Sequence, residues 1–319
     1  MNIFITGASG FIGGAIAAKL RENHNLLAMS RSEKTDLAIK ELGAEPIRSE
    51  LGEVKAEHLH GVDVIIHSAA FVSPWGKKEE YRKITIDGTA QLLKVAKEAG
   101  VKRFIHISSE AALFAGQDML DIDETYNYPK KHKFLYPWSK AESEKLVRDA
   151  NQTGKFETIV LRPRLVWGPG DQTVLPALVE MVNKGQFAWM DEGRYETSTT
   201  HIQNFVHAVK LALTAGRPGE VYFITDGEKT SFREFLTKLL ATRNIVPPSK
   251  SIPSWFARTL AFLLEGVYKI FFIRKEPPLT RFAANIMSAH CTIRIDKARL
   301  ELNYSPQINI DQGLKALSQ

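Results

Sequence analysis

Three side chains in the middle of the chain, Ser109, Tyr136 and Lys140, could together move a proton. A free tyrosine has a pKa of about 10, too high for ready proton exchange at neutral pH. A lysine ammonium nearby favours the phenolate and lowers that pKa, and residues four apart share one face of a helix. Tyr136 could then give a proton to a carbonyl oxygen or accept one from an alcohol, while Ser109 holds that oxygen. The trio predicts acid–base chemistry on a ketone or an alcohol.

The same pair has a plain structural explanation, because a tyrosine and a lysine four residues apart occur on many helices. The start of the chain favours chemistry: an apolar run at 3–5 leads into a glycine turn and an alanine-rich helical pattern at 15–20. Glycines let backbone N–H groups and the positive end of a helix dipole approach a pyrophosphate. We therefore expect this turn to bind a dinucleotide. Its residues are Gly7, Ser9, Gly10, Phe11, Ile12 and Gly13.

The end of the next apolar run, at 26–29, bears on the choice of cofactor. Dinucleotide folds that select NAD carry an Asp or Glu about 20 residues beyond the glycine turn, where it binds the adenosine ribose. This chain has Ser30 and Arg31 at that place. A serine does not repel a 2′-phosphate, and a guanidinium pairs with one through charge-assisted hydrogen bonds. We expect NADP rather than NAD; the structural alternative is a solvated surface arginine.

Apolar runs continue to alternate with helical patterns along the first half of the chain. This alternation predicts an α/β fold, a doubly wound, mostly parallel Rossmann sheet with a smaller, mainly helical C-terminal substrate lobe. We place the NADP-binding domain at 1–165, with strand and helix material from about 200–228 returning to it, and the lobe at 166–319. Further strands are expected at 44–48, 62–66, 103–107, 158–161 and 221–224, with helices at 81–99 and 134–152.

Ligands of such sheets bind outside the carboxyl ends of the strands. The residues at or just after those ends are Gly7, Arg31, His67, Ser109 and Pro163, and their convergence supports the site more than any single motif. We expect the polar segment 117–133 to be a loop over the cleft. The apolar segment 257–273 is shorter than the ~20 residues of a spanning helix, and we favour a core or lobe helix over a weakly membrane-associated one.

With these residues in place, the chain resembles the extended short-chain dehydrogenase/reductase family, nearest the branch of 3β-hydroxysteroid dehydrogenases and dihydroflavonol reductases. The resemblance covers essentially the full length and rests on the three glycines, residues 67–70, Ser108-Ser109, Tyr136-x-x-x-Lys140, 161–163 and 167–170. It implies that Ser109, Tyr136 and Lys140 are catalytic, Ser109 matching the second residue of the family's Ser-Ser/Thr pair. Besides the turn, Ser30 and Arg31, the cofactor-binding residues that we expect are Glu50, Leu51, His67, Ala69, Ala70, Ser108, Tyr136, Lys140 and Pro163.

Two positions depart from the family pattern. Thr85 stands where a helix motif usually begins with asparagine, which puts an asparagine-supported proton relay in doubt. Thr197 stands where the nucleotide-sugar enzymes of the family commonly carry an arginine for the nucleotide phosphate. A diphosphate would find little positive charge there, and this argues against nucleotide sugars.

Composition sets further bounds. The chain has 319 residues, of which 44% are hydrophobic and 24% charged, as in ordinary soluble proteins. Its net charge of +6 is scattered, so we expect no nucleic-acid partner. The single cysteine, Cys291, rules out an internal disulfide and fits a reducing compartment. We expect a cytoplasmic protein with a small-molecule substrate and no metal, and the resemblance implies a homodimer through the helix of Tyr136 and its neighbour.

The favoured function is NADP-dependent interconversion of a ketone and a secondary alcohol on a fairly apolar, steroid-, flavonoid- or terpenoid-like molecule. In this hypothesis Tyr136 is the general acid/base, Lys140 lowers its pKa and Ser109 orients the substrate oxygen. Aromatic residues of the lobe are candidates for the substrate wall: Trp167, Phe187, Trp189, Trp255 and Phe256. The alternatives are an NAD-dependent epimerase or dehydratase of a sugar-type substrate and a non-catalytic dinucleotide sensor.

Overall fold

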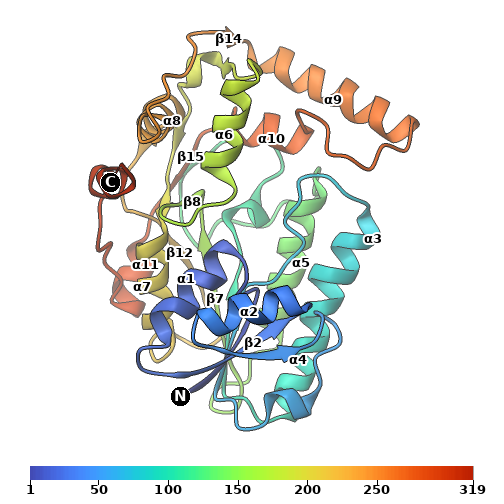
Figure 1. The fold of residues 1–319 in the computed structure, drawn as a ribbon, viewed down its shortest axis with the longest axis vertical. Helices are drawn as coiled ribbons and strands as arrows, with labels where there is room; N and C mark the ends of the chain where they lie inside the picture. Colours follow the sequence, from blue (N-terminus) through green and yellow to red (C-terminus); the bar gives the residue numbers. More distant parts are fainter. Residues whose placement is uncertain (319) are drawn as a thin grey trace.

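Seven parallel strands form the main sheet of the molecule (Figure 1). The computed structural model describes residues 1–318. The spatial order is β12-β7-β5-β4-β1-β2-β3, so the chain reverses its direction across the sheet between β3 and β4. The predicted Rossmann sheet is therefore confirmed. Its strands are β1 Asn2–Thr6, β2 Asn25–Ser30, β3 Glu45–Arg48, β4 Val64–His67, β5 Arg103–Ile107, β7 Glu157–Pro163 and β12 Val221–Ile224.

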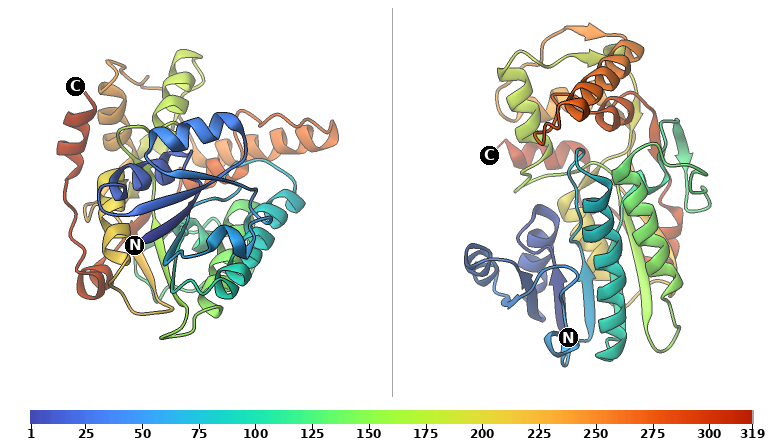
Figure 2. Two further views of the ribbon diagram at one scale, coloured as in Figure 1. Left: turned by 60° about the horizontal axis from the view of Figure 1, so that its bottom comes forward. Right: turned by 90° about the vertical axis from the view of Figure 1, so that its right-hand side faces the viewer.

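Helices cover both faces of this sheet (Figure 2). Ile3 and Ile5 of β1 belong to the core under α1 and α7, whereas Phe4 belongs to the core under α4 and α5. Successive side chains of a strand point to opposite faces, so a strand covered on both sides must be apolar throughout, as the sequence of β1 is. The helices are α1 Phe11–Leu20, α2 Glu33–Glu41, α4 Gly88–Glu98, α5 Leu135–Asp149 and α7 Ile202–Ala212.

The helix expected at 81–99 contains an irregularity. It begins with a short turn, α3 Lys78–Glu80, passes through a π-helical segment at Tyr81–Asp87 and continues as α4. A π-helical turn fits an extra residue into the helix and is often found near functional sites. Here it contains Thr85, whose hydroxyl accepts a hydrogen bond from the Phe71 amide at 3.0 Å. Thr85 thus supports the loop that follows β4.

The remaining elements are mostly C-terminal and form a smaller, mainly helical lobe (Figure 2). Its helices are α6 Val174–Asn183, α8 Phe232–Ala241, α9 Ser254–Ile270, α10 Arg281–Ile286 and α12 Ile310–Leu317, while α11 Asp296–Leu302 packs against α7 and β12. The short strands are β6 Met119–Ile122, β8 Val166–Trp167, β9 Trp189–Met190, β10 Glu196–Thr197, β11 Thr200–His201, β13 Thr230–Ser231, β14 Ser251–Ile252 and β15 Cys291–Ile293. Single 3-10 turns lie at Ala56–Leu59, Glu110–Leu113 and Asp191–Gly193.

The expectation of an unstructured loop at 117–133 is wrong in part, because this segment contains β6. The strand pairs in parallel with β15, with Met119 opposite Cys291. Met119 and Ile122 are buried, and the Asp121 amide donates to Thr292 Oγ1 at 2.8 Å. A four-residue strand whose partner lies about 170 residues away leaves little local pattern, so the polar composition of the segment dominated the prediction.

The aromatic residues proposed for the substrate wall lie elsewhere. Trp167, Phe187 and Trp189 are buried in the lobe core against α6 and α8, whereas Trp255 and Phe256 are exposed on α9. The large apolar side chains of α9 likewise point outward, so the segment expected at 257–273 to be a core or lobe helix is a helix of the lobe and not of the core. Within residues 1–318, no helix combines the length and the apolar character needed to cross a bilayer.

Candidate active site

The three proton-transfer residues come together at the carboxyl edge of the sheet. Ser109 follows β5 by two residues and begins a 3-10 turn, where its hydroxyl accepts from the Ala111 amide at 3.1 Å. Tyr136 and Lys140 lie one turn apart on α5, which packs against that 3-10 turn. Tyr136 is half-buried, and its ring contacts Phe282 of α10 with centroids 5.6 Å apart.

The electrostatics of Tyr136 differ from the expectation. Burial, together with the nearby Glu110 carboxylate, raises the pKa of the phenol to about 12, although hydrogen bonding with Ser109 opposes the shift. The net shift of the Tyr136 pKa is therefore upward, opposite to the predicted lowering, because burial and Glu110 dominate it. Lys140 instead donates from Nζ to the Ile107 carbonyl at 2.7 Å. Burial lowers the pKa of its own ammonium to about 8, partly offset by Glu144.

A buried ion pair supports this face of α5 from behind. Glu144 lies four residues beyond Lys140 and accepts two hydrogen bonds from Arg162 of β7, one from Nε at 3.0 Å and one from Nη2. It also accepts hydrogen bonds from the hydroxyls of Ser108 and Tyr128. Burial alone would raise the pKa of Glu144, but Arg162 and these hydrogen bonds hold it below its usual value. Ser108 is only 4% exposed and its hydroxyl is hydrogen-bonded to Glu144, so that hydroxyl is not free for the cofactor, and the expected contact of the residue stays a prediction.

A second buried ion pair touches Ser109 directly, and sequence reasoning missed it. Glu110 accepts from Ser109 Oγ at 2.6 Å through one oxygen and from Arg164 Nη1 at 2.6 Å through the other. Arg164 also donates from Nε to Thr197 Oγ1 at 2.9 Å. Glu110 is 5% exposed and Arg164 2%. Charged residues placed directly after buried strands were the available signal, since a charge rarely enters a core without a partner.

The glycine turn fits the pyrophosphate of a nicotinamide dinucleotide. Gly7 has a φ of +76°, and a Cβ on Gly13 would lie 2.2 Å from the Gly7 carbonyl oxygen, so both positions need glycine for packing. A Cβ on Gly10 would meet only that oxygen, at 3.4 Å. Gly10 precedes α1 and provides no side-chain cap. Ser9 and Gly10 are exposed, and Phe11 and Ile12 partly so. The first N–H groups of α1 can therefore meet an anion at close range.

The residues after β2 divide into one ligand candidate and one structural residue. Arg31 is exposed, and among residues 1–318 its guanidinium has no hydrogen-bonding or ion-pair partner. Ser30 is 1% exposed, and its hydroxyl is engaged with Thr35 Oγ1 at 2.8 Å and the Ser32 carbonyl at 3.1 Å. The Ser30 hydroxyl is thus part of the capping network at the start of α2, and the expected contact of this residue with the cofactor stays a prediction.

The side chain of His67 also has a structural role, and the expected contact of this residue with the cofactor stays a prediction. It is fully buried, with Nδ1 2.8 Å from Thr6 Oγ1 and Nε2 2.9 Å from Thr89 Oγ1. Burial, with Lys140 nearby, lowers the pKa of the imidazole to about 3. The neutral ring links β1, β4 and α4, and its side chain is not available to a cofactor. The Thr6 hydroxyl also accepts from the Ala69 amide at 3.1 Å, which orders the loop after β4.

The other residues expected to contact the cofactor are exposed or lie at the carboxyl ends of strands. Glu50 is exposed. Leu51 is partly buried and packs against Gly88, because a Cβ on Gly88 would lie only 2.7 Å from the Leu51 side chain. Ala69 and Ala70 are partly buried after β4. Pro163 is buried at the last position of β7. All of them lie at the carboxyl ends of main-sheet strands: Pro163, Ala69 and Ala70 on or just after strands next to β5, and Glu50 and Leu51 after β3 at the edge of the sheet.

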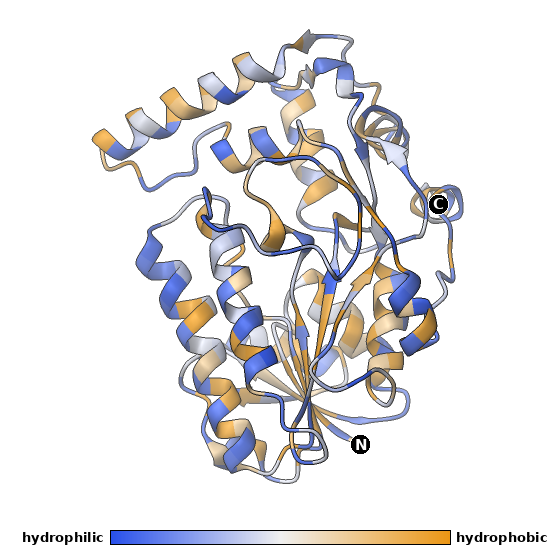
Figure 3. Cartoon of the chain, turned by 180° about the vertical axis from the view of Figure 1, so that it is seen from behind, coloured by the Kyte–Doolittle hydropathy of each residue, from blue (hydrophilic) through white to orange (hydrophobic). Residues whose placement is uncertain are grey.

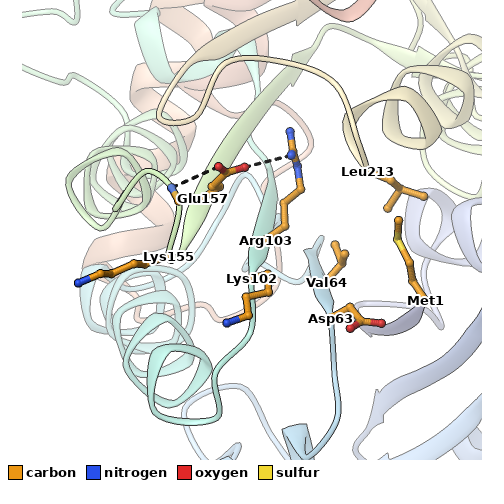
Figure 4. Close-up of a pocket in the computed structure, with 9 residues that line it drawn as sticks. Met1, Asp63, Val64, Lys102, Arg103, Lys155, Glu157 and Leu213 are labelled. Atoms are coloured by element: carbon orange, nitrogen blue, oxygen red, sulfur yellow. Dashed lines mark hydrogen bonds and ion pairs between the residues drawn. The ribbon is translucent and has the colours of Figure 1, made fainter.

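A hollow occurs at the opposite edge of the sheet (Figure 4). Residues at its lining include Met1, Asp63, Lys102, Arg103 and Glu157. These lie at the amino ends of the strands, where Arg103 pairs with Glu157 at 3.2 Å. In parallel α/β sheets ligands bind at the carboxyl ends, so this hollow is separate from the candidate site.

Comparison with known proteins agrees with this geometry. The model of the 3-beta hydroxysteroid dehydrogenase/isomerase family matches residues 4–253. A similar protein is the 4-hydroxy-2-methyl-3-oxo-4-farnesyl-3,4-dihydroquinoline-1-oxide ketoreductase of Stigmatella aurantiaca, 38% identical over 100% of this chain and 96% of its own. Another is the 2-alkyl-3-oxoalkanoate reductase of Stenotrophomonas maltophilia, 32% identical over 99% and 98%.

Solved structures share the fold. UDP-glucuronic acid 4-epimerase from Bacillus cereus, solved with UDP-glucuronic acid and NAD, superposes with a TM-score of 0.76 at 21% identity, covering 100% of this chain and 98% of that one. Relatives aligned over the whole chain are named as ketoreductases and dehydrogenases. The protein is therefore an NAD(P)-dependent ketone/alcohol oxidoreductase. It belongs to the 3-beta hydroxysteroid dehydrogenase/isomerase family, within the extended short-chain dehydrogenases/reductases.

Proposed function

We propose that this protein reduces the ketone of an apolar small molecule to a secondary alcohol with NADPH, using Ser109, Tyr136 and Lys140. The observation that carries the proposal is that a phenol, a hydroxyl and a buried ammonium lie at the same carboxyl edge of the sheet as the glycine turn. The nicotinamide would supply the hydride. The residues of the chain would bind and orient the ketone and supply the proton.

Each residue has a separate role in this proposal. Tyr136 donates its phenolic proton to the ketone oxygen as negative charge develops there. Lys140, held at the Ile107 carbonyl, stabilises the resulting phenolate through its positive charge. Ser109 donates a hydrogen bond to the same ketone oxygen after its hydroxyl turns from Glu110.

The protonation state of Tyr136 favours the reductive direction. With a pKa of about 12, the phenol keeps its proton at pH 7 in all but about one molecule in 10⁵. Reduction of a ketone needs a proton donor, whereas oxidation of an alcohol needs the phenolate. The arrangement thus suits the donor at neutral pH.

Two observations support the cofactor and the substrate class. The end of β2 has the exposed Arg31 and no carboxylate at the place where NAD enzymes bind the ribose. Near Tyr136, the ring of Phe282 packs against Phe114 and Phe134, with centroids 6.3 and 5.7 Å apart. The partly exposed Phe282 ring offers an apolar surface beside Tyr136, which suits an apolar substrate, and the two named relatives act on a farnesyl-bearing dihydroquinoline oxide and on 2-alkyl-3-oxoalkanoates.

A screen of apolar ketones, followed by NADPH absorbance, tests the reaction. For a substrate found in this way, Tyr136→Phe is expected to lower kcat by about 10²–10⁴-fold, the usual contribution of a general acid. Full turnover by this variant would refute the proposed role of Tyr136. Net NADPH consumption also separates a reductase from an epimerase, which returns its cofactor unchanged.

Calorimetry with NADPH and NADH tests the cofactor. Arg31→Ala is expected to weaken NADPH binding by about 10–100-fold, as for the loss of a hydrogen bond to a charged group, and to leave NADH binding unchanged. The exposed Lys34 is the matched control, because Lys34→Ala removes one nearby positive charge without removing the guanidinium. Equal affinity of the wild type for both cofactors would contradict the NADP assignment.

A further inference from the structure

Helix α9 exposes its large apolar side chains and turns small side chains and one carboxylate toward the protein. Ala257, Ala261 and Glu265, spaced four apart, form its buried side. The Glu265 carboxylate accepts from the Arg281 amide of α10 at 2.7 Å. A surface helix of a water-soluble domain normally buries its apolar stripe and exposes its polar face. The reversed pattern indicates that something other than water covers the outer side of α9.

Exposed apolar side chains recur along α9 and the turn after it, and Figure 3 colours much of this helix as hydrophobic. We call this surface the α9 patch. It contains ten of the large apolar side chains that are exposed among residues 1–318. They are Trp255, Phe256, Leu260, Phe262, Leu263, Val267, Ile270, Phe271, Phe272 and Ile273. An exposed apolar surface of this extent marks an interaction site.

Aromatic residues lie at both ends of the α9 patch. Trp255 is 66% exposed at the start of the helix, and Phe271 and Phe272 are 70% and 89% exposed at its end. Tryptophan is enriched where apolar chains meet polar headgroups, because its ring is apolar and its N–H is polar. In a helix that lies flat on a membrane, aromatic residues at both ends of the helix reach the same depth in the headgroup region.

The charges around the α9 patch also favour a lipid surface. Residues 250–276 contain five basic side chains and two carboxylates, Glu265 and Glu276. Glu265 is on the buried side of α9 and Glu276 lies beyond the helix, so the outward face of α9 itself carries no negative charge. Lys250 lies before the helix, and Arg274 and Lys275 follow it; all three are exposed. An apolar face with cations beside it complements the acyl chains and headgroups of an anionic bilayer.

We propose that α9 binds the protein to an anionic membrane surface, with the helix lying in the plane of the headgroups and the α9 patch in the outer acyl region. The link from α9 to the catalytic residues is short. Arg281 of α10 lies over the Phe262 ring at 5.3 Å, and the next residue, Phe282, contacts Tyr136. The site would thus lie just behind the membrane-facing helix.

Flotation with lipid vesicles tests the proposal directly. The full-length protein is mixed with vesicles of phosphatidylcholine alone, or of phosphatidylcholine with one quarter phosphatidylglycerol, and centrifuged through a density step. The wild type is expected to float with the anionic vesicles. Leu263→Glu combined with Val267→Glu is expected to abolish flotation, because both side chains enter the acyl region. Leu300→Glu is the matched control, since Leu300 is 84% exposed on α11.

The cationic contribution is tested separately. Arg274→Ala and Lys275→Ala are each expected to weaken partitioning into the anionic vesicles by about fivefold, the effect of one cation near such a surface. Added salt should produce a similar loss in the wild type. Trp255 fluorescence, taken as the difference between wild type and Trp255→Phe, should shift to the blue with vesicles.

Three results would overturn the proposal. The first is wild-type protein that stays unbound with both vesicle types. The second is equal flotation of the double glutamate variant, whose folding is checked by an unchanged melting temperature. The third is a wild-type dimer in sedimentation that becomes monomeric in the double variant without any vesicle binding, because a second copy of the chain would then cover the α9 patch.

Discussion

Replacing Glu110 with glutamine tests both the stability and the electrostatics of the site. The buried carboxylate binds Ser109 through one oxygen and Arg164 through the other. The amide of glutamine has nearly the same shape but no charge. Glu110→Gln therefore leaves the Arg164 guanidinium, 2% exposed, without its anion, and removes the negative charge that helps to raise the pKa of Tyr136.

The loss of stability follows from burial. Breaking a buried ion pair by removing one partner costs about 3–5 kcal/mol. An unfolding entropy of about 2.1 cal/mol/K per residue amounts to about 0.7 kcal/mol/K for 319 residues. The melting temperature of Glu110→Gln is therefore expected to fall by about 4–8 °C in scanning calorimetry. A fall below about 2 °C would refute the claim that the Glu110 charge is needed to bury Arg164.

The same variant has a kinetic signature. Tyr136 must lose its proton before it can act as a base, so alcohol oxidation speeds up as pH rises toward the pKa of the phenol. Without the Glu110 charge that pKa falls, and the rising limb of kcat/KM against pH is expected to move to lower pH. Thr197→Val is the control, because it removes the other acceptor of Arg164 without changing the charge near Tyr136. An unmoved limb in Glu110→Gln would refute the electrostatic link.

Three further predictions concern other parts of the site. Ketone reduction is expected to slow about tenfold per pH unit above pH 8, because Lys140, with a pKa of about 8, then becomes neutral and no longer stabilises the phenolate; a pH profile flat to pH 10 would contradict this. Gly10→Ala is expected to weaken NADPH binding in calorimetry at an unchanged melting temperature, whereas Gly13→Ala should lower that temperature, because its Cβ would meet the backbone at 2.2 Å; identical melting curves for both variants would contradict this. Glu144→Gln is expected to cost about 3–5 kcal/mol in urea unfolding by leaving Arg162 unpaired. The low pKa of Glu144 stabilises the fold above its unfolded pKa, so acid should reduce the difference between wild type and variant; a difference independent of pH would count against the pair.

The Rossmann sheet and the position of the site were predictable because their signals are local. A strand covered on both faces must be apolar at every residue, which marks β1 and β4 within four or five positions. The spacing of the glycine turn is also local, because Gly7 has a positive φ and a Cβ on Gly13 would meet the Gly7 carbonyl oxygen. The spacing of Tyr136 and Lys140 follows from the helix period alone.

The roles of individual polar residues were less predictable, because hydrogen-bond partners come from distant segments. Ser30, His67 and Ser108 were expected to touch the cofactor, yet each side chain is hydrogen-bonded within the protein, and His67 and Ser108 have partners 61 and 36 residues away along the chain. Neighbours in space decide whether a hydroxyl or an imidazole stays free, and composition does not record them. β6 was missed for the same reason, since its partner β15 lies far along the chain.

The charged residues inside the fold show most clearly what the sequence alone could not predict. The four-residue spacing put Lys140 near Tyr136, but the direction of the pKa shift depends on everything within a few ångströms in a medium of low polarity. Glu110, Arg164 and the depth of burial became known only from tertiary packing, and burial and Glu110 together reverse the expected sign. Local spacing therefore identified which residues could do the chemistry, and the packed interior set their protonation states.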